Sequence, residues 1–314
     1  MPVYNIAPYL DRCAASLTGQ TYTALEILLV DDGSTDGSAA LCAAWAARDA
    51  RVRCIRQANA GLSAARNAGL AAATGDYIAF TDGDDWLEPD AVRRLVSLLE
   101  AHRLDAAGCA FRRVADETPS DRPPDGGPVF YTRESAMAAL ISERVHQVVW
   151  NKLYRRGLIR DIPFEPGRCH EDEFWTWRVF VRLGRYAETG YIGYNYRQRP
   201  GSIMNAAWSP RRLDAVEGRV QRQRYLEAAM PSLAGQGREN LLLCCLYNGR
   251  LALETPPSAE RREAMERLGR IFRDNRSFRP GETVPGRTRR LCFAAASVSF
   301  PAVCRLQSLL RVGR

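Results

Sequence analysis

Strand and helix signals alternate through the first hundred residues, and this alternation constrains the fold more than any other feature of the sequence. Short apolar runs are separated by stretches of helical length, an order typical of a parallel sheet with helices on its faces. We expect strands over 25–30, 52–56 and 77–81, and helices over 38–48, 62–73 and 91–101. The sequence therefore predicts an α/β fold.

Two of these strands end in clusters of acidic residues. Asp31-Asp32-Gly33-Ser34 follows the first strand, and Asp82-Gly83-Asp84-Asp85 follows the third. Ligands of open α/β sheets bind beyond the carboxyl ends of the strands. Two carboxylates on one tight turn suit a small hard cation that also binds phosphate oxygens. Each cluster alone could equally be a solvated loop that caps a helix, but two at one sheet edge favour a ligand site.

Composition and charge limit the classes of protein to which this chain can belong. The chain is 46% hydrophobic and 25% charged, which is typical of a globular protein. Its net charge of +8 comes almost wholly from arginine, since Lys152 is the one lysine. No basic stripe with interleaved aromatic residues and no zinc-finger or RNA-binding motif appears, so nucleic acid is not an expected partner.

Cysteine usage and the first residues favour the cytoplasm. The nine cysteines show no disulfide-framework spacing, and Met1–Asn5 lacks the basic start of a signal peptide. Residues 116–128 are rich in Pro, Gly and Asp and predict a loop, and the chain after Ser209 has a helical pattern. We expect a domain over 1–205, with halves at 1–114 and 129–205, and a helical extension over 206–314.

Five sequence blocks resemble glycosyltransferase family 2 in order and spacing: PVYN, QTYTALEILLVDDGSTDGS, NAGLSAARNAGLAAATGDYIAFTDGDDWLEPDAV, WNKLYRR and HEDEFW. The resemblance covers residues 2–202. It implies a GT-A fold, which is a Rossmann-like mixed sheet flanked by helices. It also implies an inverting enzyme with a nucleotide-diphosphate sugar donor, for which we expect a UDP-sugar. The implied cofactor is Mg²⁺ or Mn²⁺. The implied acceptor is a glycan or a lipid-linked acceptor, used in the synthesis of a surface polysaccharide or glycolipid.

The resemblance assigns donor and metal binding to particular residues. The donor-binding positions are Pro2, Val3, Tyr4, Asp32, Arg66, Asn67 and Asp82. Among these, Asp32 matches the acid that reads the nucleobase, and Asp82 matches a position near the ribose and the metal. Asp84 matches the principal metal ligand. Asp85 is expected to orient the loop.

A second group of residues is implied for the acceptor. An inverting transferase needs a base to take the proton of the acceptor hydroxyl, and such catalysis is worth roughly 10²–10⁴-fold. The resemblance assigns this role to Asp172, with Glu171 as the alternative. The residues alone would equally allow these acids to begin a helix. Trp150, Lys152 and Glu171 match the acceptor side.

The chain departs from the family pattern at its beginning. Met1 directly precedes the Pro-Val-Tyr-Asn block, so most of a central strand is missing, and we expect the native start to lie upstream. A Rossmann dehydrogenase would need a G-x-G-x-x-G turn after its first strand, which is absent. A nucleotidyltransferase would not explain the acids at 171–172. A catalytically inactive sugar-nucleotide-binding module stays open.

Residues 287–314 combine arginines with apolar residues. Its apolar run is interrupted by Pro301 and Arg305 and is too short and too polar to span a bilayer, which takes about twenty predominantly apolar residues. It is suited to an anionic membrane surface, with apolar side chains inward and arginines on the headgroups. The alternative is a terminal helix packed on the enzyme. We expect a cytoplasmic protein bound peripherally to the inner face of the membrane.

Overall fold

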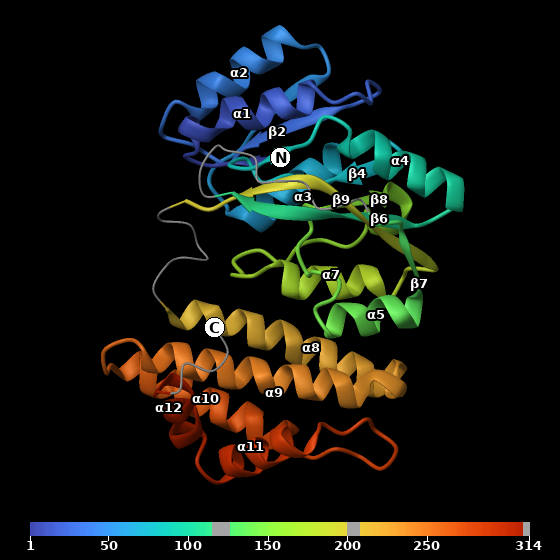
Figure 1. The fold of residues 1–314 in the computed structure, drawn as a ribbon. Helices are drawn as coiled ribbons and strands as arrows, with labels where there is room; N and C mark the ends of the chain where they lie inside the picture. Colours follow the sequence, from blue (N-terminus) through green and yellow to red (C-terminus); the bar gives the residue numbers. More distant parts are fainter. Residues whose placement is uncertain (115–125, 200–207, 310–314) are drawn as a thin grey trace. The chain divides into compact units, whose positions relative to one another are not determined.

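The computed structural model describes residues 1–114, 126–199 and 208–309 (Figure 1). The chain forms two compact units. The first consists of Met1–Met137, Gln147–Gly167 and Trp175–Ser202. The second consists of Ala138–His146, Arg168–Phe174 and Ile203–Arg314. The helical unit thus includes two segments that precede residue 206.

The first unit begins with a three-stranded parallel sheet. Its strands, in spatial order, are β1 (Pro2–Val3), β2 (Ile27–Asp31) and β3 (Val52–Arg56), and its helices are α1 (Ala7–Thr18), α2 (Ser38–Arg48) and α3 (Leu62–Ala72). All five residues of β2 are buried. Ile27 and Leu29 pack in one cluster with Leu10 of α1 and Cys42 of α2. Because a central parallel strand is buried on both faces, it appears in sequence as a continuous apolar run.

A second, mixed sheet completes this unit. In spatial order it contains β4 (Tyr77–Ala79), β8 (Lys152–Arg155), β6 (Ala106–Val114), β9 (Arg185–Arg197) and β5 (Trp86–Leu87), while β7 (Val129–Thr132) pairs with β9. β6 runs parallel to β9 and antiparallel to β8. The helices are α4 (Ala91–His102), α5 (Arg133–Ile141), α6 (Arg156–Ile159) and α7 (Asp172–Phe180). The predicted mixed α/β architecture is confirmed.

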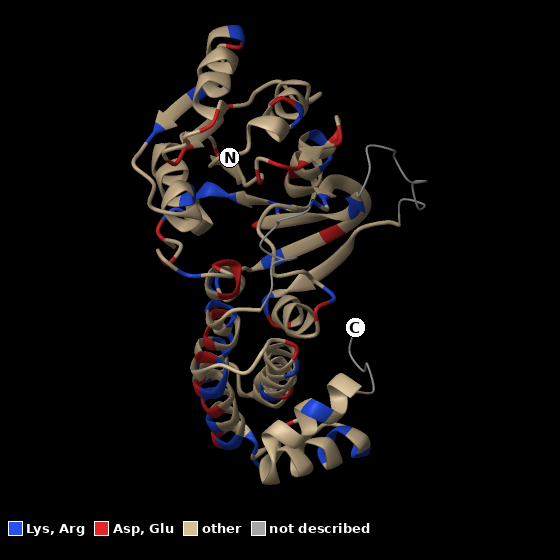
Figure 2. Cartoon of the chain, turned by 90° about the vertical axis from the view of Figure 1, so that its left-hand side faces the viewer, with Lys and Arg blue, Asp and Glu red and all other residues tan. Residues whose placement is uncertain are grey.

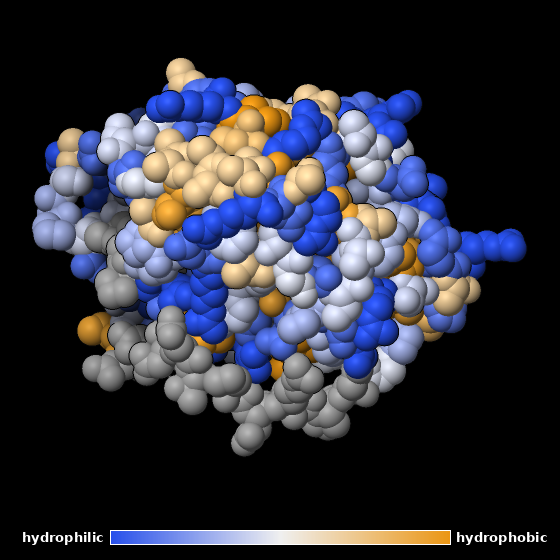
Figure 3. Space-filling model, turned by 90° about the horizontal axis from the view of Figure 1, so that it is seen from above, coloured by the Kyte–Doolittle hydropathy of each residue, from blue (hydrophilic) through white to orange (hydrophobic). Residues whose placement is uncertain are grey.

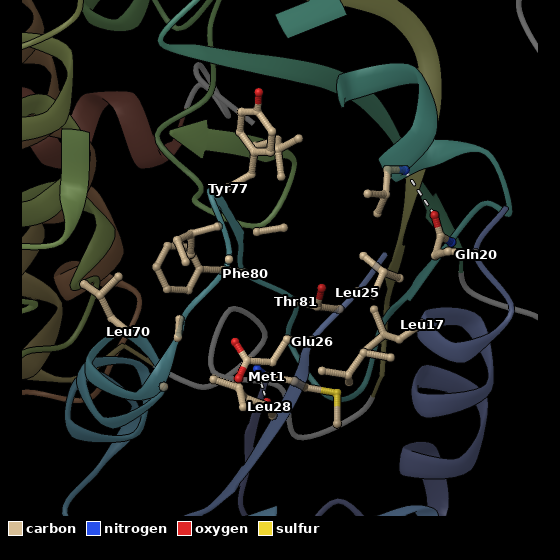
Figure 4. Close-up of a pocket in the computed structure, with 18 of the residues that line it drawn as sticks. Met1, Leu17, Gln20, Leu25, Glu26, Leu28, Leu70, Tyr77, Phe80 and Thr81 are labelled. Carbon is tan, nitrogen blue, oxygen red and sulfur yellow. Dashed lines mark hydrogen bonds between the residues drawn. The ribbon is translucent and has the colours of Figure 1, made fainter. Parts of the chain in front are cut away.

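A cavity of about 330 Å³ lies between β2 and β4. Leu25 and Leu28 line one side of it, and Tyr77 and Phe80 line the other (Figure 4). Among the described strands, β1 pairs with β2 and β4 pairs with β8, so no strand joins the two sheets. The described strands therefore form two hydrogen-bonded sheets, and the cavity lies between their strands β2 and β4. The face that carries α2 is mostly hydrophilic, with a pale apolar area (Figure 3).

An aromatic cluster holds the segment that follows β4 in place. Trp175 is fully buried, and its ring stacks on Phe164 with centroids 4.6 Å apart. Phe80 and Tyr154 meet the Trp175 ring edge-on. The indole N–H donates to the carbonyl of Ile162 at 2.7 Å, so the one polar atom of the side chain has a partner. This packing holds the segment after β4, which leads into the acidic turn.

The second unit is helical. It contains α8 (Leu213–Ala229), α9 (Pro231–Leu253), α10 (Ala259–Asn275), α11 (Arg287–Val298) and α12 (Phe300–Leu309), preceded by a 3₁₀ turn at Pro210–Arg212. Phe272 of α10 contacts Phe293 of α11 and Phe300 of α12 in its core. The helical pattern predicted after Ser209 is confirmed for the described residues. No helix in those parts of the chain is both long and apolar enough to cross a membrane.

Most of the loop predicted over 116–128 lies outside the described residues. The expected helices and strands of the first hundred residues are all present, with α2 and β3 at the expected bounds. β2 begins two residues later than expected, and β4 ends at Ala79 instead of Thr81.

Candidate active site

The acidic turn Asp82-Gly83-Asp84-Asp85 lies between β4 and β5. The amide of Asp85 donates to the carbonyl of Asp82 at 3.1 Å and closes the turn. A Cβ on Gly83 would lie 2.2 Å from the side chain of Ile6 and 3.0 Å from the carbonyl of Pro2. A side chain at this position would press on Ile6 and on the Pro2 carbonyl, so glycine allows the turn to lie close to the chain that follows β1.

Asp82 forms an ion pair with Arg66 of α3. The guanidinium lies 2.6 Å from Asp82 Oδ1, and the Arg66 side chain is only 2% exposed. The same guanidinium lies 5.5 Å from the ring centroid of Phe164, within cation–π range. Two predicted donor-binding residues are therefore in direct contact. The planar guanidinium of arginine can also donate two hydrogen bonds side by side to phosphate oxygens.

Asp84 is paired with an arginine that the sequence did not reveal. Arg199 Nε lies 2.7 Å from Asp84 Oδ2, and Arg197 Nε donates to the Asp84 carbonyl at 3.1 Å. Both guanidiniums lie near the ring of Tyr9, at 5.2 and 5.1 Å from its centroid. Arg197 and Arg199 are two residues apart at the end of β9. Because 115 residues separate Arg199 from Asp84, no local sequence signal could have identified this pair.

Asp85 is buried and faces the core of the unit. Its Oδ2 accepts from the Tyr194 hydroxyl at 2.7 Å, and its Oδ1 accepts from the Arg197 amide at 2.8 Å. Burial, and next the charges of Asp82 and Asp84, raise the pKa of Asp85 to about 8. The raised pKa favours the protonated form of Asp85, and its two hydrogen bonds anchor the turn to β9.

The acidic cluster at the end of β2 holds the loop before α3 in place through Asp32. Asp32 Oδ1 accepts from Gln57 Nε2 at 2.7 Å and from the Ala60 amide at 2.9 Å, while its Oδ2 accepts from the Gly61 amide at 2.8 Å. These bonds fix the segment that leads into α3 and Arg66. The reading of a nucleobase by Asp32 remains a prediction.

The first residues place one aromatic side chain at the surface. Val3 is fully buried, whereas the side chain of Tyr4 is 49% exposed. Pro2 and Val3 pair with Val30 and Asp31 in register. Of the predicted nucleobase contacts, Tyr4 therefore offers the most open surface for stacking on a ligand.

Asn67 is engaged with the protein backbone. Its Nδ2 donates to the carbonyl of Phe164 at 2.9 Å, and its Oδ1 accepts from the Phe164 amide at 2.8 Å. This reciprocal pair joins α3 to the loop that carries the stacked ring of Phe164. The geometry gives Asn67 a structural role beside Arg66, and its predicted contact with the nucleotide remains a prediction.

The residues predicted for the acceptor side are mostly buried. Lys152 is 1% exposed, and its Nζ donates to the carbonyl of Val148 and to Asn151 Oδ1, both at 2.8 Å. Trp150 stacks on Tyr194, with ring centroids 4.3 Å apart. Trp150 therefore supports the tyrosine that holds Asp85. The acceptor contacts of both residues remain predictions.

The predicted base belongs to the second unit. Asp172 begins α7, and its Oδ1 accepts from the Glu173 amide at 3.0 Å. His170 adopts a left-handed backbone with φ of 55°, which turns the chain just before the helix. Glu171 lies within this turn and is partly exposed. The neighbouring Glu173, which the sequence did not single out, is buried and pairs with Arg219.

Comparison with known proteins decides the family. The model of glycosyl transferase family 2 matches residues 1–163. The chain belongs to glycosyl transferase family 2. The glycosyltransferase GlyA of Streptococcus pneumoniae is 33% identical over 238 residues, which cover 70% of this chain and 33% of GlyA. The uncharacterized glycosyltransferase EpsJ of Bacillus subtilis is 33% identical over 252 residues, covering 77% of this chain and 72% of EpsJ. The chain thus spans a third of GlyA and most of EpsJ.

Solved structures support the fold of this family 2 chain. S. aureus TarS 1-349, in complex with UDP-GlcNAc, has a TM-score of 0.75 at 19% identity, covering 100% of this chain and 90% of TarS 1-349. The mannosyltransferase PcManGT from Pyrobaculum calidifontis, in complex with GDP-Man and Mn²⁺, has a TM-score of 0.54 at 16% identity, covering 99% of this chain and 86% of PcManGT. The predicted GT-A fold is confirmed.

The acidic turn of this family 2 chain offers the chemistry that a divalent cation requires. Asp82 and Asp84 supply hard carboxylate oxygens two residues apart. No group of three or more His, Cys, Asp or Glu in the described ranges could hold a metal ion. Mg²⁺ and Mn²⁺ do not need such a group, because they commonly combine one or two carboxylates with substrate phosphates and water. The residues therefore fit a cation that binds together with a diphosphate.

The raised pKa of Asp85 predicts a pH-dependent stability. Because the folded state holds this proton up to about pH 8 and the unfolded state releases it near pH 4, the free energy of unfolding falls as the pH rises between these values. The side chain in Asp85→Asn stays neutral, so the free energy of unfolding of this variant should not fall in this way. We expect the melting temperature of the variant, relative to the parent chain in EDTA, to rise between pH 5 and pH 8.

Asp49→Asn is the matched control, because Asp49 pairs with Arg51 and its pKa is lowered to about 2, outside the tested range. A melting difference for Asp85→Asn that stays constant with pH would show that Asp85 is ionised throughout.

Proposed function

We propose that this chain transfers a sugar from a nucleoside diphosphate sugar, of which a UDP-sugar is the expected donor, to an acceptor hydroxyl with inversion. The observation that carries this proposal is the acidic turn in contact with Arg66 and Arg199. A donor of this kind needs carboxylates that bind its cation and guanidiniums that bind its diphosphate. The donor and Mn²⁺ in the PcManGT complex and the UDP-GlcNAc in the TarS complex support the assignment.

The proposed donor chemistry assigns a role to each charged group. Asp82 and Asp84 would hold the cation, which neutralises the negative charge that develops on the departing diphosphate. Arg66 and Arg199 each donate to one of these carboxylates. With a cation held by Asp82 and Asp84, both guanidiniums would be able to donate to phosphate oxygens instead.

The proposed transfer is a single displacement. Asp172 takes the proton of the acceptor hydroxyl while that oxygen forms a bond to the anomeric carbon. The bond from this carbon to the diphosphate oxygen breaks, and its electron pair leaves with the nucleotide. Attack from the side opposite the leaving group inverts the anomeric centre. General base catalysis of this kind contributes about 10²–10⁴-fold.

An inactive sugar-nucleotide-binding module is the second candidate, favoured by one observation. Both acids of the turn that would hold the cation are already paired with arginines. Ion pairs that persist in the presence of a cation would leave the donor bound but unreactive. Turnover of a donor separates the two functions.

We expect hydrolysis or transfer with at least one member of a panel of nucleotide sugars, beginning with UDP-GlcNAc, in the presence of Mn²⁺. Chelation with EDTA should abolish this turnover, because the diphosphate would leave without charge compensation. Release of the nucleotide diphosphate is the measurement. Binding of a nucleotide sugar without any turnover across the panel would favour the inactive module.

Asp172→Asn should lower turnover by about 10²-fold or more and leave donor binding unchanged, because a base acts on the acceptor hydroxyl. Steady-state rates and calorimetric titration with UDP and Mn²⁺ measure the two effects. Glu171→Gln is the matched control from the same turn. Normal turnover in Asp172→Asn, with a loss in Glu171→Gln, would transfer the role to Glu171.

We also infer that α11 and α12 bind an anionic membrane, where a lipid-linked acceptor would be presented. Neither helix contains an acidic residue, and together they carry Arg287, Arg289, Arg290 and Arg305. Leu291 and Val298, seven residues apart on one helix face, are 73% and 91% exposed. Phe293 and Phe300 face the core instead. The exposed apolar side chains are therefore available for a bilayer surface. The helices near the C-terminal end of the chain carry several Lys or Arg positions, which are coloured blue (Figure 2).

The chain should sediment with vesicles that contain phosphatidylglycerol and not with pure phosphatidylcholine, and about 0.5 M NaCl should release it because salt screens the arginines. The double variant Leu291→Glu, Val298→Glu should lose this binding. Val129→Glu, an equally polar change at an exposed position of β7, is the control. Equal binding by all three chains, or none at low salt, would contradict the membrane assignment.

A further inference from the structure

The segment that carries Asp172 is attached to the first turn of α8. Both carboxylate oxygens of Asp214 contact it: Oδ2 accepts from the Cys169 amide at 2.9 Å, and Oδ1 lies 3.1 Å from the Arg168 guanidinium. Arg168 also lies over the ring of Phe174, 4.8 Å from its centroid. One side chain of α8 thus holds the beginning of the segment 168–174.

One turn later, the backbone of α8 touches the other end of the segment. A Cβ on Gly218 would lie 2.9 Å from the carbonyl oxygen of Glu173 and 3.0 Å from its Cβ. Asp214 and Gly218 are four residues apart and therefore share one face of the helix. This face packs directly on the main chain that follows Asp172.

Arg219 adds a buried ion pair at the same place. Its guanidinium lies 2.8 Å from Glu173 Oε1, and both side chains are at most 15% exposed. Arg219 also donates to Asn240 Oδ1 of α9 at 3.0 Å and lies 3.3 Å from Glu143. An arginine with several fixed partners holds its plane in one orientation. Glu173, the residue after Asp172, is thereby fixed to two helices.

The turn between these anchors contains the left-handed residue His170, with φ of 55°. A non-glycine residue in this conformation persists only where the surrounding contacts define it. Asp214 bonds to the residues just before His170, and Gly218 and Arg219 contact Glu173 beyond Asp172. The contacts from α8 are therefore placed on both sides of the turn that presents Asp172.

We propose that α8 positions the catalytic base, with Asp214 and Arg219 as positioning residues that hold the turn 168–174 in one conformation. The proposal rests on the proposed function of Asp172 as the base. It gives the helical unit a role in the reaction that is separate from membrane binding: the helices fix the carboxylate that must meet the acceptor hydroxyl. A misplacement of about 1 Å at a reacting group can cost on the order of 10²-fold in rate.

Hydrogen–deuterium exchange tests the holding contacts without any substrate. In Asp214→Ala and in Arg219→Gln, the amides of 168–174 should exchange faster than in the parent chain, while the core amides of β2 and β6 keep their protection. Glu217→Gln is the matched control, because Glu217 lies on the same helix and pairs with Arg267 of α10. Unchanged exchange of 168–174 in both variants would overturn the proposal.

Kinetics test the consequence, with release of UDP from UDP-GlcNAc in Mn²⁺ as the probe. Asp214→Ala and Arg219→Gln should lower kcat about 10- to 100-fold at unchanged KM for the donor. Arg219→Lys should restore part of the rate, and Glu217→Gln should behave as the parent chain. A merely structural role would lower the melting temperature and the amount of active protein without this split between kcat and KM.

Asp172→Asn measured beside these variants separates the two claims. One outcome is that turnover is lost in Asp172→Asn while Asp214→Ala and Arg219→Gln keep full kcat. That result would overturn the positioning role of Asp214 and Arg219 and would support Asp172 as the base. Full turnover in Asp172→Asn would refute the base itself. Faster exchange of 168–174 would then still establish that α8 holds the turn. If Arg219→Gln fails to fold, Asp214→Ala carries the test, because its carboxylate is partly exposed.

Discussion

The charge balance of the acidic turn is the constraint on which the candidate site depends. Three carboxylates occur within four residues shortly after β4, and such a cluster of charges is costly when it is left unpaired. Arg66 neutralises Asp82, Arg199 neutralises Asp84, and Asp85 keeps a proton beside Tyr194. These contacts tie α3 and the end of β9 to the turn, and both carboxylates keep part of their exposure to water.

The same balance explains how one site can be stable both with and without a ligand. A nucleoside diphosphate and a divalent cation bring opposite charges in nearly equal amounts. In the proposed complex the carboxylates would bind the cation and the arginines would bind the diphosphate, so the net charge of the site would change little. Arg66 is already fixed by the aromatic ring of Phe164, which lowers the entropic cost of placing it against a ligand.

Local sequence patterns predicted the elements that local interactions determine. The bounds of α2 and β3 were predicted correctly, because apolar periodicity and the change from Ala-rich helix to strand are encoded within a few residues. The pairing of Asp84 with Arg199 spans 115 residues and leaves no local signal. The burial of Lys152 could not be predicted from the sequence either, because a lysine side chain is usually exposed. In the structure its ammonium group donates to Val148 and Asn151. The grouping of Asp172 with the helical unit also depends on contacts with α8 that no short motif reveals.

The central claim is that Asp84 holds a divalent cation through which a nucleoside diphosphate binds. Calorimetric titration of UDP into the parent chain and into Asp84→Asn, each with Mn²⁺ and with EDTA, tests it most directly. The account predicts that the parent chain binds UDP only with Mn²⁺ and that Asp84→Asn weakens this binding at least about tenfold, which corresponds to roughly 1.4 kcal/mol. Equal affinity for UDP in Mn²⁺ and in EDTA, unchanged by Asp84→Asn, would contradict it.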